Sequence, residues 1–228
     1  NEEFIRQQVV ADEGDPYNSL LHNKTINNLR GANIFKSVKS DVKNGSNEGL
    51  KIIDITVEEK PTGEIKAGAG YGTRGSTFMV GINENNFNGK GIKLGIDLTF
   101  NEESIKGKID YTNPNFRYSD RSVTTSIEST TTDREKDYGY KSSLSRIALG
   151  TKFEQYKDIY FSPNLSISSE SLTTTSNASE NYKKQEGSYF DTLFNYALTY
   201  DKRDSFYRPK DGFISTFVQE IPLYSDGY

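Results

Sequence analysis

The sequence of 228 residues contains no cysteine and no tryptophan, one methionine, and a single histidine, His22. Without cysteine the chain cannot form disulfides, cysteine-based zinc sites or cysteine nucleophiles. Chemistry of the Ser–His–Asp type would depend on His22 alone, which has no ligand-spaced companion. We therefore expect no enzymatic activity, no catalytic residue, no metal site and no cofactor.

The chain also lacks an excess of basic residues and any long apolar run. Its 28 Lys and Arg against 32 Asp and Glu give a net charge of −4, which argues against a dedicated nucleic-acid-binding protein. No run approaches the roughly 18 consecutive apolar residues that a membrane-spanning helix needs. A membrane β-barrel would escape this test, because its strands alternate in polarity and each gives a weak hydropathy signal.

Small polar residues and aromatics dominate the composition instead. Apolar residues make up only 33% of the chain, whereas it contains 24 Ser, 19 Thr and 19 Asn, which argues against a thick globular core. The 15 Tyr and 13 Phe are strong β-formers, and their abundance is not typical of a disordered chain. The composition therefore indicates a protein that is ordered mainly by β-structure.

Residues 1–60 combine two helical patterns with two strand-like ones. Apolar residues recur at helical spacing between residues 2 and 10, and Gly and Pro within 12–16 end the pattern. A second helix is predicted from Asn18, a suitable N-cap, to a left-handed stop within 31–33. Strand-like runs follow at 35–42 and 50–58. The predicted order is helix, helix, strand, strand.

After a charged, proline-containing joint at 58–63, helical periodicity disappears and a period of two begins. In 92–100, for example, every second residue is Ile, Leu or Phe. Many of these runs are close to the roughly 9–11 residues of a tilted transmembrane strand. The nine predicted strands are 64–72, 77–83, 92–100, 104–112, 121–131, 139–153, 158–171, 188–200 and 212–221.

Two architectures fit nine alternating strands. Short turns that carry aromatics alternate with longer polar loops at 132–138 and 172–187, as on the two sides of an outer-membrane barrel. A soluble β-sandwich also has alternating strands and remains the other possibility. The mixed N-terminal segment and the sidedness of the loops favour the barrel. Because barrels usually have an even number of strands, we expect more strands after Tyr228 and a longer protein.

An ordered series of motifs carries a resemblance to a known family. The motifs span essentially the whole chain and are more specific together than singly. They lie at 13–18 (Glu-Gly-Asp-Pro-Tyr-Asn), 29–38, 57–63, 68–72 (Gly-Ala-Gly-Tyr-Gly), 84–91, 112–116 and 201–212. In this order they resemble the BamA family, the bacterial outer-membrane β-barrel assembly factors built from POTRA domains and a barrel.

The resemblance implies an α+β POTRA domain followed by an all-β antiparallel transmembrane barrel. Residues 1–62 would be the barrel-proximal POTRA domain without its first strand, and residues 63–228 the first nine strands of a 16-stranded barrel. The barrel would lie in the outer membrane of a Gram-negative bacterium and the POTRA domain in the periplasm. Asn33 stands where the family usually has glycine, a change that is tolerated because Asn also adopts a left-handed conformation.

The resemblance further implies an insertase, which folds other β-barrel proteins into the outer membrane without ATP or covalent chemistry. Unpaired backbone groups are very costly in hydrocarbon, so an incoming strand needs a partner edge. In the family the first barrel strand offers that edge at a weak lateral seam. The predicted template is the backbone of Ile65, Lys66, Ala67, Gly68, Ala69, Gly70 and Tyr71.

Two further site predictions each have a simpler alternative. Gly68, Gly70 and Gly72 would weaken the template strand, as an openable seam requires, or would only make room inside the barrel for other segments. Glu13 occupies the position of an acidic POTRA residue that pairs with the lipoprotein BamD in the family, or is a solvated loop acid.

The expected partners follow from the same resemblance. They are unfolded outer-membrane β-barrel proteins, a BamD-like lipoprotein, other lipoproteins of the assembly complex, and outer-membrane lipid. No nucleic acid is expected. The alternative function is that of a related POTRA-barrel transporter, of the translocation and assembly module or of two-partner secretion.

Overall fold

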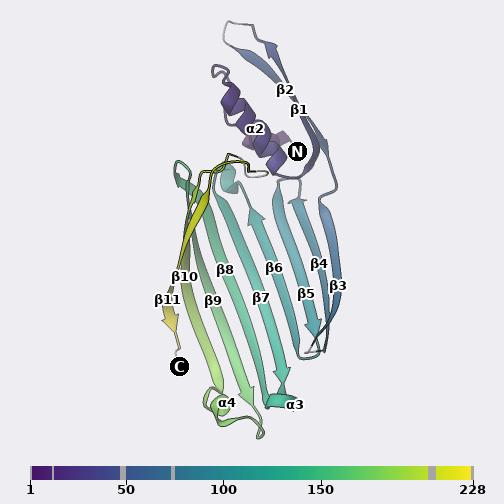
Figure 1. The fold of residues 1–228 in the computed structure, drawn as a ribbon, viewed down its shortest axis with the longest axis vertical. Helices are drawn as coiled ribbons and strands as arrows, with labels where there is room; N and C mark the ends of the chain where they lie inside the picture. The colour runs from purple at the N-terminus through teal and green to yellow at the C-terminus, as the bar shows by residue number, and fades with distance from the viewer. Residues whose placement is uncertain (1, 12, 47–49, 73–74, 205–208, 227–228) are drawn as a thin grey trace.

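The computed structural model describes residues 2–11, 13–46, 50–72, 75–204 and 209–226. A small N-terminal unit of helices and a hairpin lies beyond one end of a single large sheet (Figure 1). Part of the motif at 201–212, residues 205–208, lies outside the described residues. We call the end of the sheet next to the N-terminal unit the near end and the opposite end the far end.

The N-terminal unit has the predicted order of helix, helix, strand, strand. Its elements are α1 (Glu2–Gln7), α2 (Ser19–Gly31), β1 (Phe35–Asn44) and β2 (Lys51–Glu59), and the two strands pair as an antiparallel hairpin. The first helix ends earlier than predicted, at Gln7 instead of near residue 10. The predicted start of α2 is confirmed, because the Asn18 side chain accepts hydrogen bonds from the backbone N–H groups of Leu20 and Leu21.

The core of this unit lies between α2 and the hairpin. Leu29 is fully buried, and Ile26 and Val38 pack with it. After α2, Asn33 adopts a φ of 57°, which is the left-handed stop expected in that region. This turn directs the chain back along α2 as β1, and the hairpin thereby covers the apolar side of the helix.

The second part of the chain forms a nine-stranded antiparallel sheet in which each strand pairs with its neighbours in sequence. All nine predicted strands are present, and each is longer than predicted. They are β3 (Gly63–Gly72), β4 (Gly75–Phe87), β5 (Ile92–Asn101), β6 (Ser104–Asn113), β7 (Ser122–Arg134), β8 (Tyr140–Tyr156), β9 (Ile159–Thr174), β10 (Gly187–Asp201) and β11 (Ile214–Ser225). Within the described residues β3 and β11 are edge strands, so the sheet is open.

The two faces of the sheet differ sharply in chemistry. Seven isoleucines, one on each strand from β3 to β9, pair directly in register and form one row across the sheet. We call them the isoleucine row: Ile65, Ile82, Ile96, Ile109, Ile127, Ile147 and Ile167. Since directly paired residues share a face, the row defines an apolar face, and the alternate residues of each strand define a polar face.

The apolar face is exposed, which is the reverse of a soluble sheet. Every member of the isoleucine row is at least 40% exposed, and Ile65 is 82% exposed. Figure 1 shows no second layer over either face, since the N-terminal unit lies beyond the strand ends. A β-sandwich would bury this face against a second sheet, whereas the described strands form one sheet, so the sandwich alternative is not supported. An outer-membrane barrel turns such a face toward lipid.

The far end of the sheet carries two ordered connections in place of the predicted plain loops. They contain the short helices α3 (Glu135–Tyr138) and α4 (Glu180–Lys184). The Thr175 N–H donates to the Gly139 carbonyl oxygen at 2.7 Å, and Tyr140 stacks on Tyr182 with ring centroids 4.4 Å apart. These contacts join the two connections.

The described residues contain no helix that is both long and apolar enough to cross a membrane.

Candidate strand-pairing edge

The predicted template residues all lie on β3, at the edge of the sheet. Within the described residues β3 pairs with β4 alone, so the hydrogen-bonding groups on its other side have no strand partner. Ile65 and Tyr71 are 82% and 87% exposed, more than any other large apolar side chains of the described sheet. An edge with free N–H and C=O groups is a ready partner for another strand.

Three glycines of β3, Gly68, Gly70 and Gly72, make no close contacts that would require glycine. A β-carbon on Gly70 or Gly72 would meet no heavy atom within 4 Å, and one on Gly68 would meet only the flexible tip of Met79, at 3.5 Å. None of the three adopts a positive φ. Packing against the described chain therefore does not explain them, whereas glycine does lower the intrinsic stability of a strand.

The apolar side of β3 has small side chains between two large ones. Ala67 and Ala69 lie between Ile65 and Tyr71 on this face, and their partners on β4 are Val80 and Phe78. The polar side of β3 carries Glu64, Lys66 and the three glycines. A strand that pairs with β3 would thus meet little side-chain bulk near Ala67–Gly70, and backbone pairing would dominate the contact.

Glu13 lies far from β3 in the fold, in the connection between α1 and α2. Its side chain is 88% exposed and forms an ion pair with Arg6 of α1, with Oε1 2.6 Å from the guanidinium Nη1. Arg6 also pairs with Glu2 at 2.9 Å, and the hydrogen bonds that its guanidinium donates to Glu13 and Glu2 raise the pKa of the Arg6 side chain. The predicted partner-binding acid, Glu13, is accessible, but within the chain it already forms an ion pair with Arg6.

A joint between the N-terminal unit and the sheet was not predicted from the sequence. Phe4 of α1 is only 3% exposed and packs on Gly91 in the turn after β4, where a β-carbon would collide with the ring. Gly91 has a φ of 68°. The Gly-Lys-Gly run at 89–91 is the signal that could have indicated a close backbone approach.

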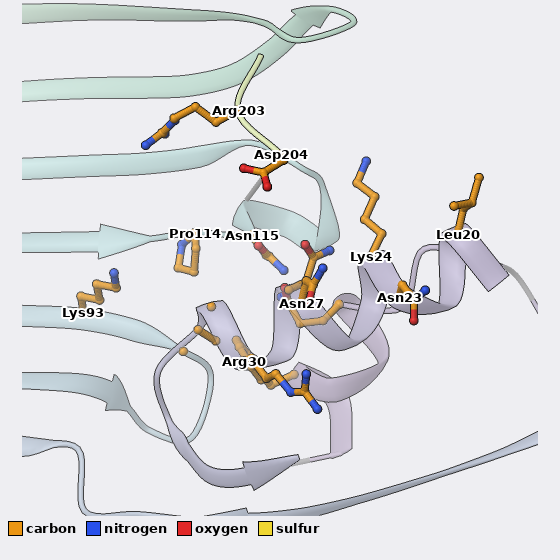
Figure 2. Close-up of a pocket in the computed structure, with 16 residues that line it drawn as sticks. Leu20, Asn23, Lys24, Asn27, Arg30, Lys93, Pro114, Asn115, Arg203 and Asp204 are labelled. Carbon is orange, nitrogen blue, oxygen red and sulfur yellow. The ribbon is translucent and has the colours of Figure 1, made fainter. Parts of the chain in front are cut away.

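A cavity of about 890 Å³ lies beside this joint, between α2 and the near end of the sheet. Figure 2 shows Asn23, Lys24 and Asn27 on α2 and Asn115 and Asp204 on the turns opposite. In the described residues this region is bridged by few polar contacts, among them one of 3.5 Å between Asn115 Nδ2 and Gln7 Oε1. Contacts of Phe4 and Gln7 in α1, and of Thr62 in the linker before β3, join the unit to the sheet.

No group of three or more His, Cys, Asp or Glu side chains that could hold a metal occurs in the described part of the chain. His22 lies on α2, where its Nε2 is 3.1 Å from the Ser40 hydroxyl of the hairpin.

The arrangement at β3 offers backbone groups and an apolar face. What it can do chemically is pair with another strand.

The comparison with known families decides the broad assignment. Residues 86–226 match the Omp85 superfamily domain. The chain belongs to the Omp85 superfamily. The Omp85 match begins inside β4 and runs to the end of β11, so it covers most of the sheet. The strands of the sheet accordingly belong to a β-barrel outer-membrane protein of the Omp85 superfamily.

Individual relatives agree with this Omp85 assignment. A protein of Treponema pallidum (strain Nichols) with the provisional name outer membrane protein assembly factor is 29% identical over 117 residues, which are 48% of this chain and 14% of that protein. The crystal structure of BamA from Haemophilus ducreyi lacking POTRA domains 1–3 matches 98% of this chain and 46% of that chain, with 19% identity and a TM-score of 0.71.

Two further solved structures share the Omp85 fold of this chain. CdiB from Acinetobacter baumannii matches with a TM-score of 0.63 and 9% identity, and CdiB from Escherichia coli with 0.63 and 12%. Both matches cover 98% of this chain, and they cover 44% and 43% of the CdiB chains. At such identities the likeness establishes the fold alone. The chain spans less than half of each of these structures.

Proposed function

We propose that this Omp85 protein is an insertase that folds β-barrel proteins into the outer membrane, with β3 as the strand on which a substrate strand pairs. The observation that carries the proposal is the make-up of β3: Gly68, Gly70 and Gly72 make almost no contacts within the described residues, and the flanking Ile65 and Tyr71 are exposed. The provisional name of the Treponema relative supports the same role.

Physical chemistry explains why such an edge would accelerate insertion. In hydrocarbon each unpaired backbone group costs several kcal/mol, so a strand cannot enter lipid singly. A strand paired on β3 satisfies one side of its backbone at once. Its apolar residues then continue the apolar face beyond Ile65 into the lipid. The protein needs no nucleotide for this step, because the pairing and burial are themselves favourable.

The N-terminal unit, in this proposal, is the barrel-proximal POTRA domain, residues 1–62, and it lies in the periplasm beneath the barrel. The match to the BamA structure supports this, because it covers 98% of the chain and therefore includes most of the helices and the hairpin. Glu13 is the proposed contact for a BamD-like lipoprotein, since it is exposed on this unit. Unfolded outer-membrane proteins would be the substrates and outer-membrane lipid the surroundings.

Cysteine cross-linking in the full-length protein tests the template, and residues 1–228 contribute no native cysteine to the background. We expect a disulfide between Cys introduced at Ala69 and Cys in the last strand of a stalled barrel substrate, with yields that follow strand register. The matched control is Phe78→Cys. Phe78 pairs with Ala69 and shares its face, but it lies one strand further in, about 10 Å from a strand paired on β3.

Cross-links at Ala69 and not at Phe78 would establish β3 as the template. If Ala69→Cys links only to the protein's own last strand and never to substrate, the insertase proposal fails. The related transporter function would then account better for an Omp85 barrel with this N-terminal unit.

A further inference from the structure

Charged residues on the polar face form a row next to the isoleucine row, and their signs alternate. From β3 to β10 the directly paired residues are Lys66, Gly81, Asp97, Lys108, Glu128, Arg146, Ser168 and Asp191. We call this set the charge row. Wherever two of its charged residues are direct partners, they have opposite sign. Opposite charges on facing positions stabilise strand pairing, and like charges weaken it.

Neighbouring contacts show that charges on this face do find partners across and along the strands. Lys106 Nζ lies 3.1 Å from a Glu128 carboxylate oxygen on the next strand, and Lys108 Nζ lies 2.9 Å from Asp110. The Asp97 carboxylate occupies the space over Gly81, where a β-carbon would collide with its oxygen. Direct strand pairing thus places charges of alternating sign side by side from β5 to β8, and the Asp97 carboxylate reaches over Gly81 of β4.

Lys66 is the end of the charge row at the open edge. It is exposed, and no carboxylate of the described residues lies within ion-pair distance of its ammonium. Its neighbour is the neutral Asn83 side chain on β4, whose amide oxygen accepts from Lys66 in the orientation that satisfies both groups. Glu64 lies on the same face two residues earlier. Asn83, which accepts from Lys66, is the direct strand partner of Glu64. On the side of β3 away from β4, the Lys66 ammonium therefore has no charged partner within the described residues. An incoming strand would pair on this side.

We propose that Lys66 selects the incoming strand by charge, favouring a substrate strand that places Asp or Glu opposite Lys66 on the polar face. This inference rests on the proposed function of β3 and adds a specificity-determining side chain to a contact otherwise made by backbone. The next member of an alternating row that ends in lysine is an acid. Pairing is antiparallel throughout this sheet, so the substrate residue three positions after the one opposite Ala69 faces Lys66.

A competition experiment tests this in the full-length protein with Cys at Ala69. Two versions of one eight-stranded outer-membrane barrel protein are supplied in equal amounts. Both carry Cys in the last strand opposite Ala69, and they differ only in having Asp or Lys three residues later. We expect the Asp version to cross-link about two- to fivefold more than the Lys version, and the K66E variant to reverse the preference.

Lys93→Glu is the matched control, because Lys93 lies on the same face of an interior strand and forms no ion pair within the described residues; it should leave the preference unchanged. Equal cross-linking of the Asp and Lys versions, or a preference that persists in the K66E variant, overturns the charge selection while leaving β3 as a template. Absence of any cross-link at Ala69 with either version overturns the template itself, and the selection with it.

Discussion

Glu13 and Arg6 connect the end of α1 to the segment before α2 through an ion pair between two exposed side chains. A solvent-exposed pair of this kind contributes little to stability, because both charges are well hydrated without it. Its accessibility is what matters for the proposed lipoprotein contact. The structure places Glu13 where a cationic partner could reach it, and it also supplies a rival cation within the chain.

We predict that Glu13→Lys lowers the amount of BamD-like lipoprotein that co-purifies with the full-length protein by at least about fivefold, because it replaces attraction with repulsion at the contact. Arg6→Ala is the control. It also abolishes the intramolecular pair but leaves the Glu13 carboxylate free, so it should keep or increase the co-purified lipoprotein. An equal loss in both variants would mean that the internal pair, and not a partner contact, explains the effect.

On the scale of elements, β3 is the strand whose composition departs most from its neighbours, and glycine accounts for the difference. We predict that Gly70→Ala slows substrate assembly about two- to fivefold. Alanine stabilises a strand by about 0.5–1 kcal/mol relative to glycine, and here it would strengthen the seam that has to open. The added methyl group meets no atom within 4 Å, so steric strain in the described chain would not explain the result.

Gly107→Ala provides the comparison, because Gly107 lies on the interior strand β6 and its β-carbon would meet only the Leu98 side-chain tip, at 3.4 Å. The assembly rate of a barrel substrate in lipid vesicles measures both variants. Gly107→Ala should not slow it. If Gly70→Ala leaves the rate unchanged as well, the glycines do not set the strength of the seam, and making room inside the closed barrel becomes the better explanation.

The elements themselves were largely predictable from the sequence, for a clear physical reason. A period of two reports which face of a strand is apolar, and Asn18 and Asn33 mark the start and the end of α2 through local hydrogen bonding and backbone conformation. Helices α3 and α4 were missed because they are single turns held by contacts between two connections. The packing of Phe4 on Gly91 was missed because it joins residues far apart in sequence.

The site was predictable only in part. That the strand at 64–72 would carry the template came from a family resemblance together with its glycines. The charge row could not be read from the sequence, because it depends on the register of eight strands, and a shift of one residue in any pair would destroy it. Lys66 was thus predicted as a backbone position only, whereas its side chain became informative once its row partners were known.

For the whole molecule, the apolar band runs obliquely across the strands. On β4 the apolar side chains continue from the isoleucine row toward the far end, through Val80 and Phe78. On β9 they continue toward the near end, through Leu165, while Ser169 takes the corresponding position toward the far end. Strands of a membrane barrel are tilted by about 35–45°, so a band at constant depth has to cross successive strands at shifted positions. The shift of the apolar positions from the far end on β4 to the near end on β9 is therefore what a tilted sheet in lipid requires.

This geometry predicts how a charge would act on each face. Ile127→Lys places an ammonium within the isoleucine row on the interior strand β7. We expect it to destabilise the protein in lipid vesicles, with the free energy of unfolding lowered by about 2–4 kcal/mol. The adjacent Ser126→Lys points to the polar face, where its direct partner is Asp110, and should change stability little. Urea titration of the full-length protein in vesicles measures both. A similar loss of stability in the two variants would show that the isoleucine row does not contact hydrocarbon. The apolar face would then not point outward to lipid, and the proposed pairing at β3 depends on that direction.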